Sequence, residues 1–481
     1  MRRAGWICGA LVFTAGCRVS TPYVPPPAPA PAAKTPADAY KELNGWKTAQ
    51  PAEGTLRGKW WELFGDAQLN RLEERVDVSN QDLKAAEARF REARALVRIE
   101  RSAEFPVVSI SPGIGNLRDS AKAPYAPANP EPAGDFALPL DVSWEADIWG
   151  RIRQRVAATR EEAQAEAADL ESVRLILHAE LAVDYFELRN ADAQKRLLDE
   201  TVESYREALQ LTTHRFEEGA APKSDVSQAK TQLDSAQVAD TDIAVARAEF
   251  EHAIAVLTGA PPSAFAIAEN PPALAVPNVP VGVPSQMLER RPDIAAAERR
   301  VAEANEEIGI ARAAFYPTVS LSAVLGMEGH SIASWLTWPA RFWAVGPSMA
   351  ETVFDAGRRR AASESALASY DAAVAAYRQT VLAAFQQVED NLAVLRVLEQ
   401  EARQQQEATA AAHESLELVT NRYREGADPY LQVLTAQTIA LANERNDLDI
   451  LRRRMDSSVL LVKALGGGWT AALLPKTADL R

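Results

Sequence analysis

Cysteine and histidine are both scarce in this chain of 481 residues. The two cysteines, Cys8 and Cys17, lie near the amino terminus, so no disulfide can form in the rest of the chain, and its stability must come from packing and assembly. The five histidines show no metal-ligand spacing and no His-Glu-x-x-His motif: His178, His214, His252, His330 and His413. A Walker-type phosphate loop is missing as well. The sequence therefore predicts neither an enzyme nor a metal site.

An excess of positive charge and long apolar runs are also missing. The chain has 52 basic and 66 acidic residues and a net charge of −14, which argues against nucleic-acid binding, because proteins with that function present a basic face. Although 47% of the residues are hydrophobic, no apolar run of about 18 residues follows the amino-terminal segment. If the chain crosses a membrane, we expect it to do so with strands.

The amino terminus has the pattern of an export signal. Two arginines follow Met1, and the apolar run Trp6–Ala15 is too short to span a bilayer. Small residues precede Cys17, as a lipoprotein signal peptidase requires, although Thr14 stands where leucine is usual. We predict a signal peptide over residues 1–16 and a covalent lipid on Cys17, with no other cofactor. An ordinary secretory signal with an incidental cysteine is the alternative.

Residues 17–59 are interpreted as a tether. The stretch 18–50 is rich in proline and alanine and poor in residues that form a core, so we expect it to be extended and semi-rigid. Position 18 is arginine and not aspartate, and the lipoprotein sorting rule of many Gram-negative bacteria then permits transfer to the outer membrane.

One short segment occurs twice and organises the rest of the chain. Residues 215–222 and 422–429 share the pattern Arg, aromatic, any residue, Glu-Gly-Ala, any residue, Pro. Each glycine ends a long stretch without glycine or proline, and each proline begins another; these stretches are 151–218, 358–425, 223–258 and 430–465. Glycine after a helix end and proline at a helix start are stop and start signals. The sequence therefore predicts two hairpins of very long helices, of which the longer reach roughly 100 Å.

The duplication covers most of the chain. Matches around residues 82–93 recur at 293–304, and the Gly-Arg pair at position 150 recurs at 357. We therefore expect two tandem repeats, residues 60–270 and 271–481, each with the same order of elements.

Each repeat is expected to begin with a helix, 66–104 or 292–314, and to continue with two strands. Apolar residues alternate from Phe136 to Ile148 and more weakly from Val319 to Leu325, which is the period of a strand with two different faces. The expected strands are 107–115, 136–148, 318–326 and 342–354. Aromatic residues cluster at the ends of these segments, as in the girdles of membrane barrels: Trp144, Trp149, Trp335, Trp338, Phe342 and Trp343.

These strands have two interpretations. One is a small soluble hairpin that caps the helices, and the other is a set of membrane strands, which the aromatic residues favour. Four strands cannot close a barrel, and an open edge is not tolerated in lipid, so membrane strands would require an oligomer. Dimers, trimers and larger assemblies would all satisfy that requirement.

Motifs along nearly the whole mature chain resemble a known family. They are Cys17 with its proline-rich tail, Trp60–Asp66, Arg291–Ile294, Ala314–Pro317, Phe354–Arg358 and Gly426–Gln437. The chain resembles the TolC/OprM-like outer-membrane factors, specifically the lipoprotein (NodT-like) branch that serves resistance-nodulation-division efflux systems. The resemblance implies a mainly α fold with a membrane β-barrel: a homotrimer with a twelve-strand barrel continuous with a long α-helical barrel. It also implies an equatorial belt formed by residues 17–59, the breaks midway along the helices and the carboxyl-terminal segment. Two partners are implied as well, a periplasmic adaptor and an inner-membrane proton-driven pump.

The resemblance places functional residues at the two repeated turns. Asp225 and Tyr423 match residues that hydrogen-bond across helices and hold the tip of the duct closed, although the two could equally be a helix-terminal charge and a packing residue. Leu431, Gln432 and Thr435 match constriction positions; relatives carry aspartate at one or two of these positions, so the expectation of an acidic ring is weakened. The adaptor-docking residues would be those of the turns: Gly219, Ala220, Pro222, Gly426, Ala427 and Pro429.

The sequence therefore predicts a passive outer-membrane exit duct of a tripartite efflux pump, lipid-anchored and projecting into the periplasm. A duct for protein secretion and a periplasmic coiled-coil scaffold without a channel are the alternatives. The residues do not name the exported compound, the pump or the adaptor.

Overall fold

The computed structural model describes residues 22–29, 58–118, 120–122, 131–269, 276, 277, 279, 289–476 and 478–480. The expected signal peptide and Cys17 lie outside these residues. Of the expected tether, the segment 22–29 is described, and it lies along a helix of the second half of the chain: the Tyr23 hydroxyl donates a hydrogen bond of 2.7 Å to Glu298, and Tyr23 packs against the main core.

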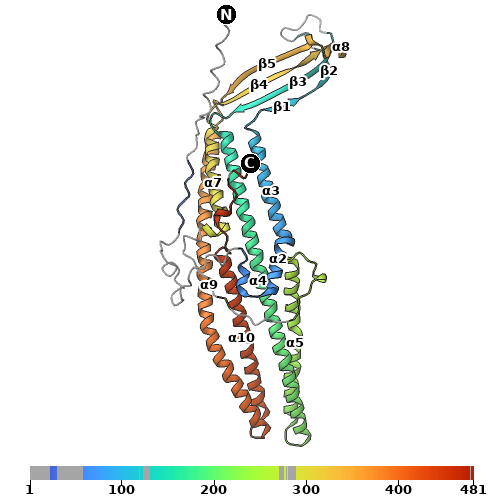
Figure 1. Cartoon of the computed structure of the whole chain (residues 1–481), viewed down its shortest axis with the longest axis vertical. Coiled ribbons are helices and arrows are strands. Elements are labelled where there is room, and N and C mark those ends of the chain that lie inside the picture. The colour runs from blue at the N-terminus through green and yellow to red at the C-terminus, as the bar shows by residue number, and fades with distance from the viewer. Residues whose placement is uncertain are drawn as a thin grey trace.

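Four long helices form two antiparallel hairpins (Figure 1). The first hairpin consists of α4 (Arg151–Glu217) and α5 (Lys223–Leu257), and the second of α9 (Arg358–Arg424) and α10 (Tyr430–Ala464). These bounds confirm the helices expected from the glycine and proline positions, because each turn begins where a glycine takes a left-handed conformation. The two hairpins have the same lengths, 67 and 35 residues, in both halves of the chain.

The two longest helices begin in the same way. Gly150 and Gly357 precede them with φ of 83° and 88°. An aspartate just upstream then accepts hydrogen bonds from free backbone N–H groups: Asp147 from Ile152 and Arg153, and Asp355 from Gly357 and Arg359. A carboxylate at a helix start satisfies unpaired donors and complements the helix dipole.

The predicted helix 66–104 is wrong in one respect, since the structure has two helices there, α2 (Ala67–Ser79) and α3 (Gln81–Ser102). Asn80 has an extended backbone and interrupts the helix. Its side chain accepts a hydrogen bond from Leu83 N–H and donates one to the carbonyl of Leu257. The break thus caps α3 and ties it to the end of α5. In the second half of the chain α7 (Pro292–Ala313) is one helix, as predicted.

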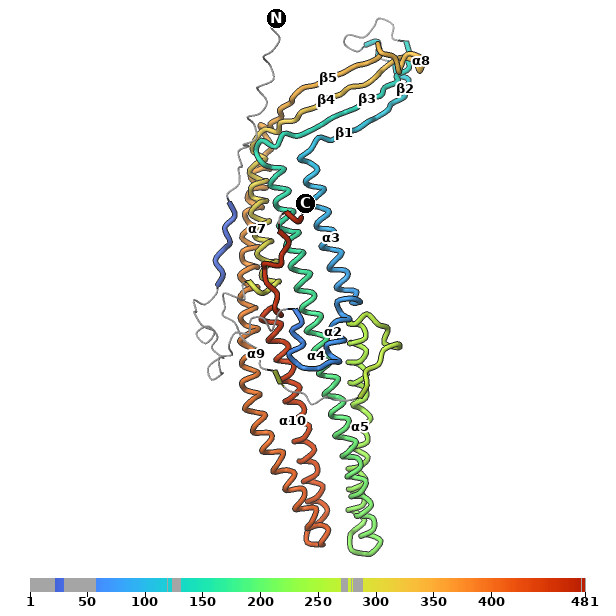
Figure 2. Tube along the Cα trace, in the orientation of Figure 1, coloured from blue at the N-terminus to red at the C-terminus, as the bar shows by residue number. Residues whose placement is uncertain are grey.

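Five strands form one antiparallel sheet at the opposite end from the turns (Figure 2). They are β1 (Val107–Ile110), β2 (Gly113–Leu117), β3 (Ala133–Ala146), β4 (Thr318–Gly329) and β5 (Arg341–Ala350). The order is β1-β3-β4-β5, and β2 pairs with β3 beyond the end of β1. The described residues therefore form a sheet four strands wide, joined to the tops of the helices.

The strand bounds differ from those expected from the sequence. The segment 107–115 is split between β1 and β2, because Pro112 lies between them and has no N–H to donate. The strand expected at 342–354 ends at Ala350, since its partner β4 begins at Thr318, directly opposite Ala350. The other two strands are longer than expected at one end: β3 begins at Ala133, and β4 continues to Gly329.

The register gives the sheet one apolar face and one that is more polar. Two rows of apolar residues cross the strands: Ile110, Leu140, Leu325 and Trp343, and then Val108, Val142, Ala323 and Val345. The rows of the other face are mixed or polar: Ser109, Asp141, Val324 and Ala344, then Val107, Ser143, Ser322 and Gly346, and then Glu145, Ser320 and Ser348. Alternation within each strand and alignment between strands thus separate the two faces.

The main core lies midway along the helical part, where both hairpins meet the short elements. It includes Trp60 and Trp61 of a 3₁₀ helix, Tyr185 and Phe186 of α4, and Val459 of α10, all nearly inaccessible to solvent. Other short elements are the 3₁₀ helices Pro262–Ala264, Trp338–Ala340 and Ala471–Leu473 and the helix α8 (Ile332–Trp335). Within the described part of the chain, no helix combines the length and the apolar character that a membrane span needs.

Candidate functional site

The two turns form the end of the molecule farthest from the sheet (Figure 1). In the first turn Gly219 has φ of 77°, and the N–H groups of Ala220 and Ala221 donate to the carbonyl of Arg215. Pro222 then begins α5 with an extended backbone. All residues of this turn from Glu217 to Ala220 are exposed. The expected docking residues of the first turn therefore lie on an accessible tip.

The second turn repeats this backbone. Gly426 has φ of 81°, its N–H donates to the carbonyl of Tyr423 at 2.9 Å, and the N–H of Ala427 donates to the carbonyl of Arg422 at 2.9 Å. Pro429 begins α10. A residue with a β-carbon is strained at such φ values, so both glycines are required by the backbone.

Arg215 connects the two tips. It donates a hydrogen bond to the carbonyl of Tyr423, and its guanidinium carbon lies 4.5 Å from the centre of the Tyr423 ring. Its Nη2 lies 3.5 Å from the place where a β-carbon on Gly426 would stand. A β-carbon at Gly426 would therefore stand in ordinary van der Waals contact with this arginine, and it is the backbone of the turn that requires the glycine. The geometry is that of a cation–π contact combined with a charge-assisted hydrogen bond.

The equivalent arginine of the second turn stays within its own turn. Arg422 forms an ion pair with Asp428, with Nε and Oδ2 2.7 Å apart. The first turn has Ala221 at the position of Asp428, so Arg215 lacks this partner and extends to the other hairpin. Sequence reasoning missed Arg215, although the missing acidic residue at position 221 was a signal that its role differs from that of Arg422.

Tyr423 is buried, and its hydroxyl lies 3.4 Å from Thr212 Oγ1 of α4. Its ring meets that of Tyr430 edge to face at 5.5 Å. Asp225 accepts a hydrogen bond of 3.3 Å from its neighbour Ser224, and among the described contacts no hydrogen bond joins Asp225 to Tyr423. Burial, together with Tyr423, Tyr205 and Asp225, raises the pKa of Tyr430 to about 12.

A small apolar cluster supports these contacts. Ala229 of α5 packs with Tyr423, Tyr430 and Val433 of the second hairpin. In this single chain the two tips are therefore joined by an apolar cluster and by Arg215.

The expected constriction residues lie on the outward face at the start of α10. Leu431 is 53% exposed, and Gln432 and Thr435 are also exposed, whereas Val433 and Ala436 face the interior. The Thr435 hydroxyl donates to the carbonyl of Leu431 at 2.9 Å. The three side chains form one exposed strip, none of them is acidic, and they face away from the helices that α10 packs against in this chain.

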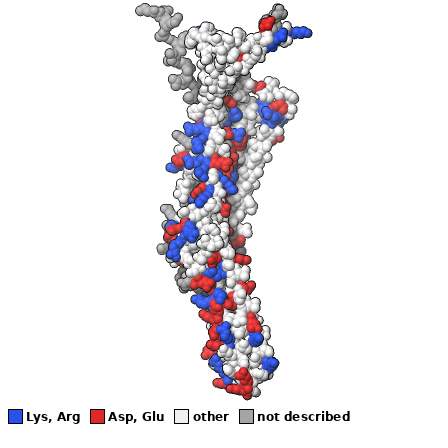
Figure 3. Space-filling view, turned by 90° about the vertical axis from the view of Figure 1, so that its right-hand side faces the viewer, with Lys and Arg blue, Asp and Glu red and all other residues white. Residues whose placement is uncertain are grey.

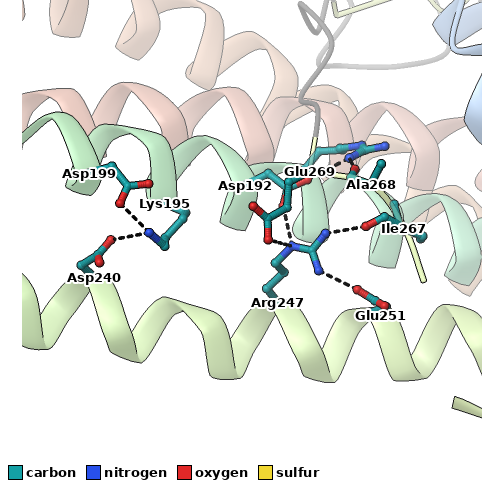
Figure 4. A network of polar contacts seen from close by, with 10 residues as sticks. Asp192, Lys195, Asp199, Asp240, Arg247, Glu251, Ile267, Ala268 and Glu269 are labelled. Carbon is teal, nitrogen blue, oxygen red and sulfur yellow. Dashed lines mark hydrogen bonds and ion pairs between the residues drawn. The ribbon is translucent and has the colours of Figure 1, made fainter. Parts of the chain in front are cut away.

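Polar networks hold the first hairpin to the segment that follows it (Figure 4). Arg247 of α5 donates to Asp192 at 2.7 Å, to Glu251 at 2.6 Å and to the carbonyl of Ile267 at 2.7 Å. Arg189 also donates to Asp192, at 2.8 Å. The two arginines that share the Asp192 carboxylate also donate to the carbonyls of Ile267 and Ala268, so this part of the segment after α5 is held against the hairpin.

A second buried polar cluster joins α2 to α4. The ring of His178 lies between Glu73, at 2.7 Å, and Asp77, at 3.3 Å, and stacks on Trp61. Burial alone would lower the pKa of His178, but the two carboxylates outweigh it and raise the pKa to about 9. This histidine is a structural member of the core. Sequence reasoning had found it only as one of five scattered histidines.

Comparison with known proteins assigns the chain to one family. The family model for "Outer membrane efflux protein" matches residues 74–260 and 283–467. The toluene efflux pump outer membrane protein TtgF of Pseudomonas putida is 32% identical over 466 residues, 95% of each chain.

Solved structures agree with that match. The outer-membrane channel OprN has a TM-score of 0.84 at 30% identity and covers 92% of this chain and 99% of its own. The open state of the MtrE outer membrane channel of Neisseria gonorrhoeae has a TM-score of 0.82 at 25% identity and covers 95% of this chain and 99% of its own. The chain therefore belongs to the outer membrane efflux protein family.

Proposed function

We propose that three copies of this chain form a passive outer-membrane exit duct of a tripartite efflux pump. In this proposal the sheets of the trimer close into a twelve-strand β-barrel, and the hairpins continue it as a helical barrel into the periplasm. A periplasmic adaptor docks on the turns, and an inner-membrane pump supplies the energy.

The observation that carries the proposal is the sheet with two different faces and two unpaired edges. The outer strands β1 and β5 each pair on one side only within the described chain. Their residues Val108, Ile110, Trp343 and Val345 belong to the apolar rows and are each at least 60% exposed. An apolar outer face, a polar inner face and edges satisfied by neighbouring copies are what a membrane barrel requires.

Strand length fits a bilayer. The 14 residues of β3 extend about 45 Å at 3.4 Å per residue, which spans a hydrocarbon core of roughly 30 Å even at a tilt of 40°. On the face shown in Figure 3, the sheet carries few charged side chains, whereas the helices carry both signs. Four strands from each chain give the twelve of the proposed trimer.

The same account assigns the remaining segments. Residues 1–16 are the signal peptide, Cys17 carries the lipid, and residues 17–59 tether it to the helices. Residues 60–270 and 271–481 are the two repeats, and the carboxyl-terminal segment completes the equatorial belt. The exposed turn residues are the adaptor-docking surface, and Leu431, Gln432 and Thr435 line the aperture.

Small molecules are the proposed cargo, since a relative that matches 95% of this chain is named for toluene efflux. The sheet with its apolar outer face disfavours the scaffold without a channel. Protein secretion is disfavoured by the family match to efflux proteins.

Two measurements test the duct. Light scattering of the protein in detergent should give the mass of a trimer, and purified protein in planar bilayers should conduct ions. A monomer with intact helices, together with bilayers that stay silent, would replace the duct with the scaffold.

A further inference from the structure

The seam between the two hairpins, formed by α4 and α10, carries more carboxylates than cations. Arg452 of α10 donates to Glu187 of α4 at 2.5 Å, which makes an ion pair between the hairpins. It also donates to Asp456 at 3.0 Å and to Asp449 at 2.8 Å on its own helix. One guanidinium is thus shared by three carboxylates.

The neighbouring charges add to this excess. On α4, the carboxyl of Asp184 is repelled by those of Glu180 and Glu187. From α9, Glu401 pairs at 3.5 Å with Arg453, which also lies 4.0 Å from Asp449. Asp456 keeps one buried carboxylate oxygen without a hydrogen bond. The seam is therefore held by attraction to Arg452 and opposed by repulsion among carboxylates.

We propose that Arg452 with Glu187, Asp449 and Asp456 forms an electrostatic joint that sets how tightly the two hairpins are held together between the core and the tips. The inference rests on the duct proposed above and concerns its regulation. On α10 the joint lies at the level of the core residue Met455, and about 19 to 26 residues, roughly 28–39 Å, separate its members from Tyr430 at the tip. A small change of angle at the joint is enlarged over that length.

Protonation of these carboxyls would change how strongly the joint holds. Burial and the charge of Glu187 raise the pKa of Asp456 to about 7, against the opposing effect of Arg452. Burial, with Glu180 and Glu187, raises the pKa of Asp184 to about 6. A carboxyl whose pKa is raised in the packed seam binds its proton more tightly there, so the packed seam is stabilised as the pH falls through 7. Conductance of the isolated duct should fall in the same range.

The test is the conductance of purified wild-type and variant trimers in planar bilayers between pH 5.5 and 8.5. Asp456→Asn should abolish most of the change near pH 7 and keep the conductance low throughout. Arg452→Gln should move the midpoint upward by about one pH unit, because an adjacent cation lowers a carboxyl pKa by that amount or more. Arg403→Gln is the matched control, since it removes an arginine of α9 that pairs with Glu399 of the same helix and not with the joint.

The outcomes separate this inference from the duct itself. If wild-type trimers conduct but Asp456→Asn keeps the wild-type pH profile, or if Arg403→Gln shifts it as much as Arg452→Gln, there is no such joint. If the wild-type protein conducts at no pH, the proposed duct function is itself contradicted.

Discussion

The two turns have nearly the same sequence and the same backbone, yet their arginines have different partners. In the second turn Arg422 is held by Asp428 of the same turn. In the first turn Ala221 replaces that aspartate, and Arg215 contacts the carbonyl and ring of Tyr423 on the other hairpin. One substitution between the repeats thus turns a local contact into a bridge between hairpins.

The comparison teaches that the tips are not equivalent surfaces. The first tip exposes Phe216, which is 41% accessible, whereas the corresponding Tyr423 of the second tip is buried beneath Arg215. We therefore expect equal substitutions in the two turns to have unequal effects.

The largest difference is expected between Gly426→Val and Gly219→Val. Both place a β-branched residue at positive φ, which costs about 1–2 kcal/mol and leaves the long helices folded. A β-carbon at Gly426 would already touch Arg215 at 3.5 Å, so the two methyl groups of valine would crowd this arginine, whereas nothing lies within 4 Å of a β-carbon at Gly219. Drug accumulation in a host with the cognate adaptor and pump should rise much more for Gly426→Val, at equal trimer levels. Equal losses of export would show that only backbone strain matters.

A smaller effect is expected from Ala221→Asp. This change gives Arg215 the partner that Arg422 already has, so the bridge to Tyr423 should weaken and the conductance of the isolated channel should rise. Ala427→Asp, at an exposed position of the second turn, is the charge-matched control. If both variants conduct like the wild type, Arg215 does not respond to a competing partner.

The smallest effects are expected from Tyr423→Phe and Asp225→Ala. The hydroxyl contact to Thr212 is long, at 3.4 Å, and a hydrogen bond contributes only about 1 kcal/mol at best. Conductance should rise slightly, and Asp225→Ala should change it less, because Asp225 contacts its neighbour Ser224 in this chain. A larger rise for Asp225→Ala would instead support the hydrogen bond between Asp225 and Tyr423 that the resemblance implies.

The sequence predicted the hairpins well because glycine and proline mark helix ends through local backbone chemistry. Each long helix ends one residue before the predicted position. The break at Asn80 was missed since asparagine is a weaker signal, and its role depends on a distant carbonyl, that of Leu257.

The contacts of the site could be predicted less well. Arg215 and Tyr423 are 208 positions apart, and nothing local shows that one lies on the other. The strand pairings supply a similar example: the alternation from Phe136 to Ile148 predicted two faces, but only the register showed that the apolar rows align across four strands.

The most direct test of the account is the single-channel conductance of Arg215→Ala beside that of Arg422→Ala. Each variant removes the same side chain from the same place in a repeated turn. We predict that Arg215→Ala raises the conductance of the trimer and that Arg422→Ala leaves it near the wild-type value. Equal conductance of the two variants would contradict the bridge between the tips.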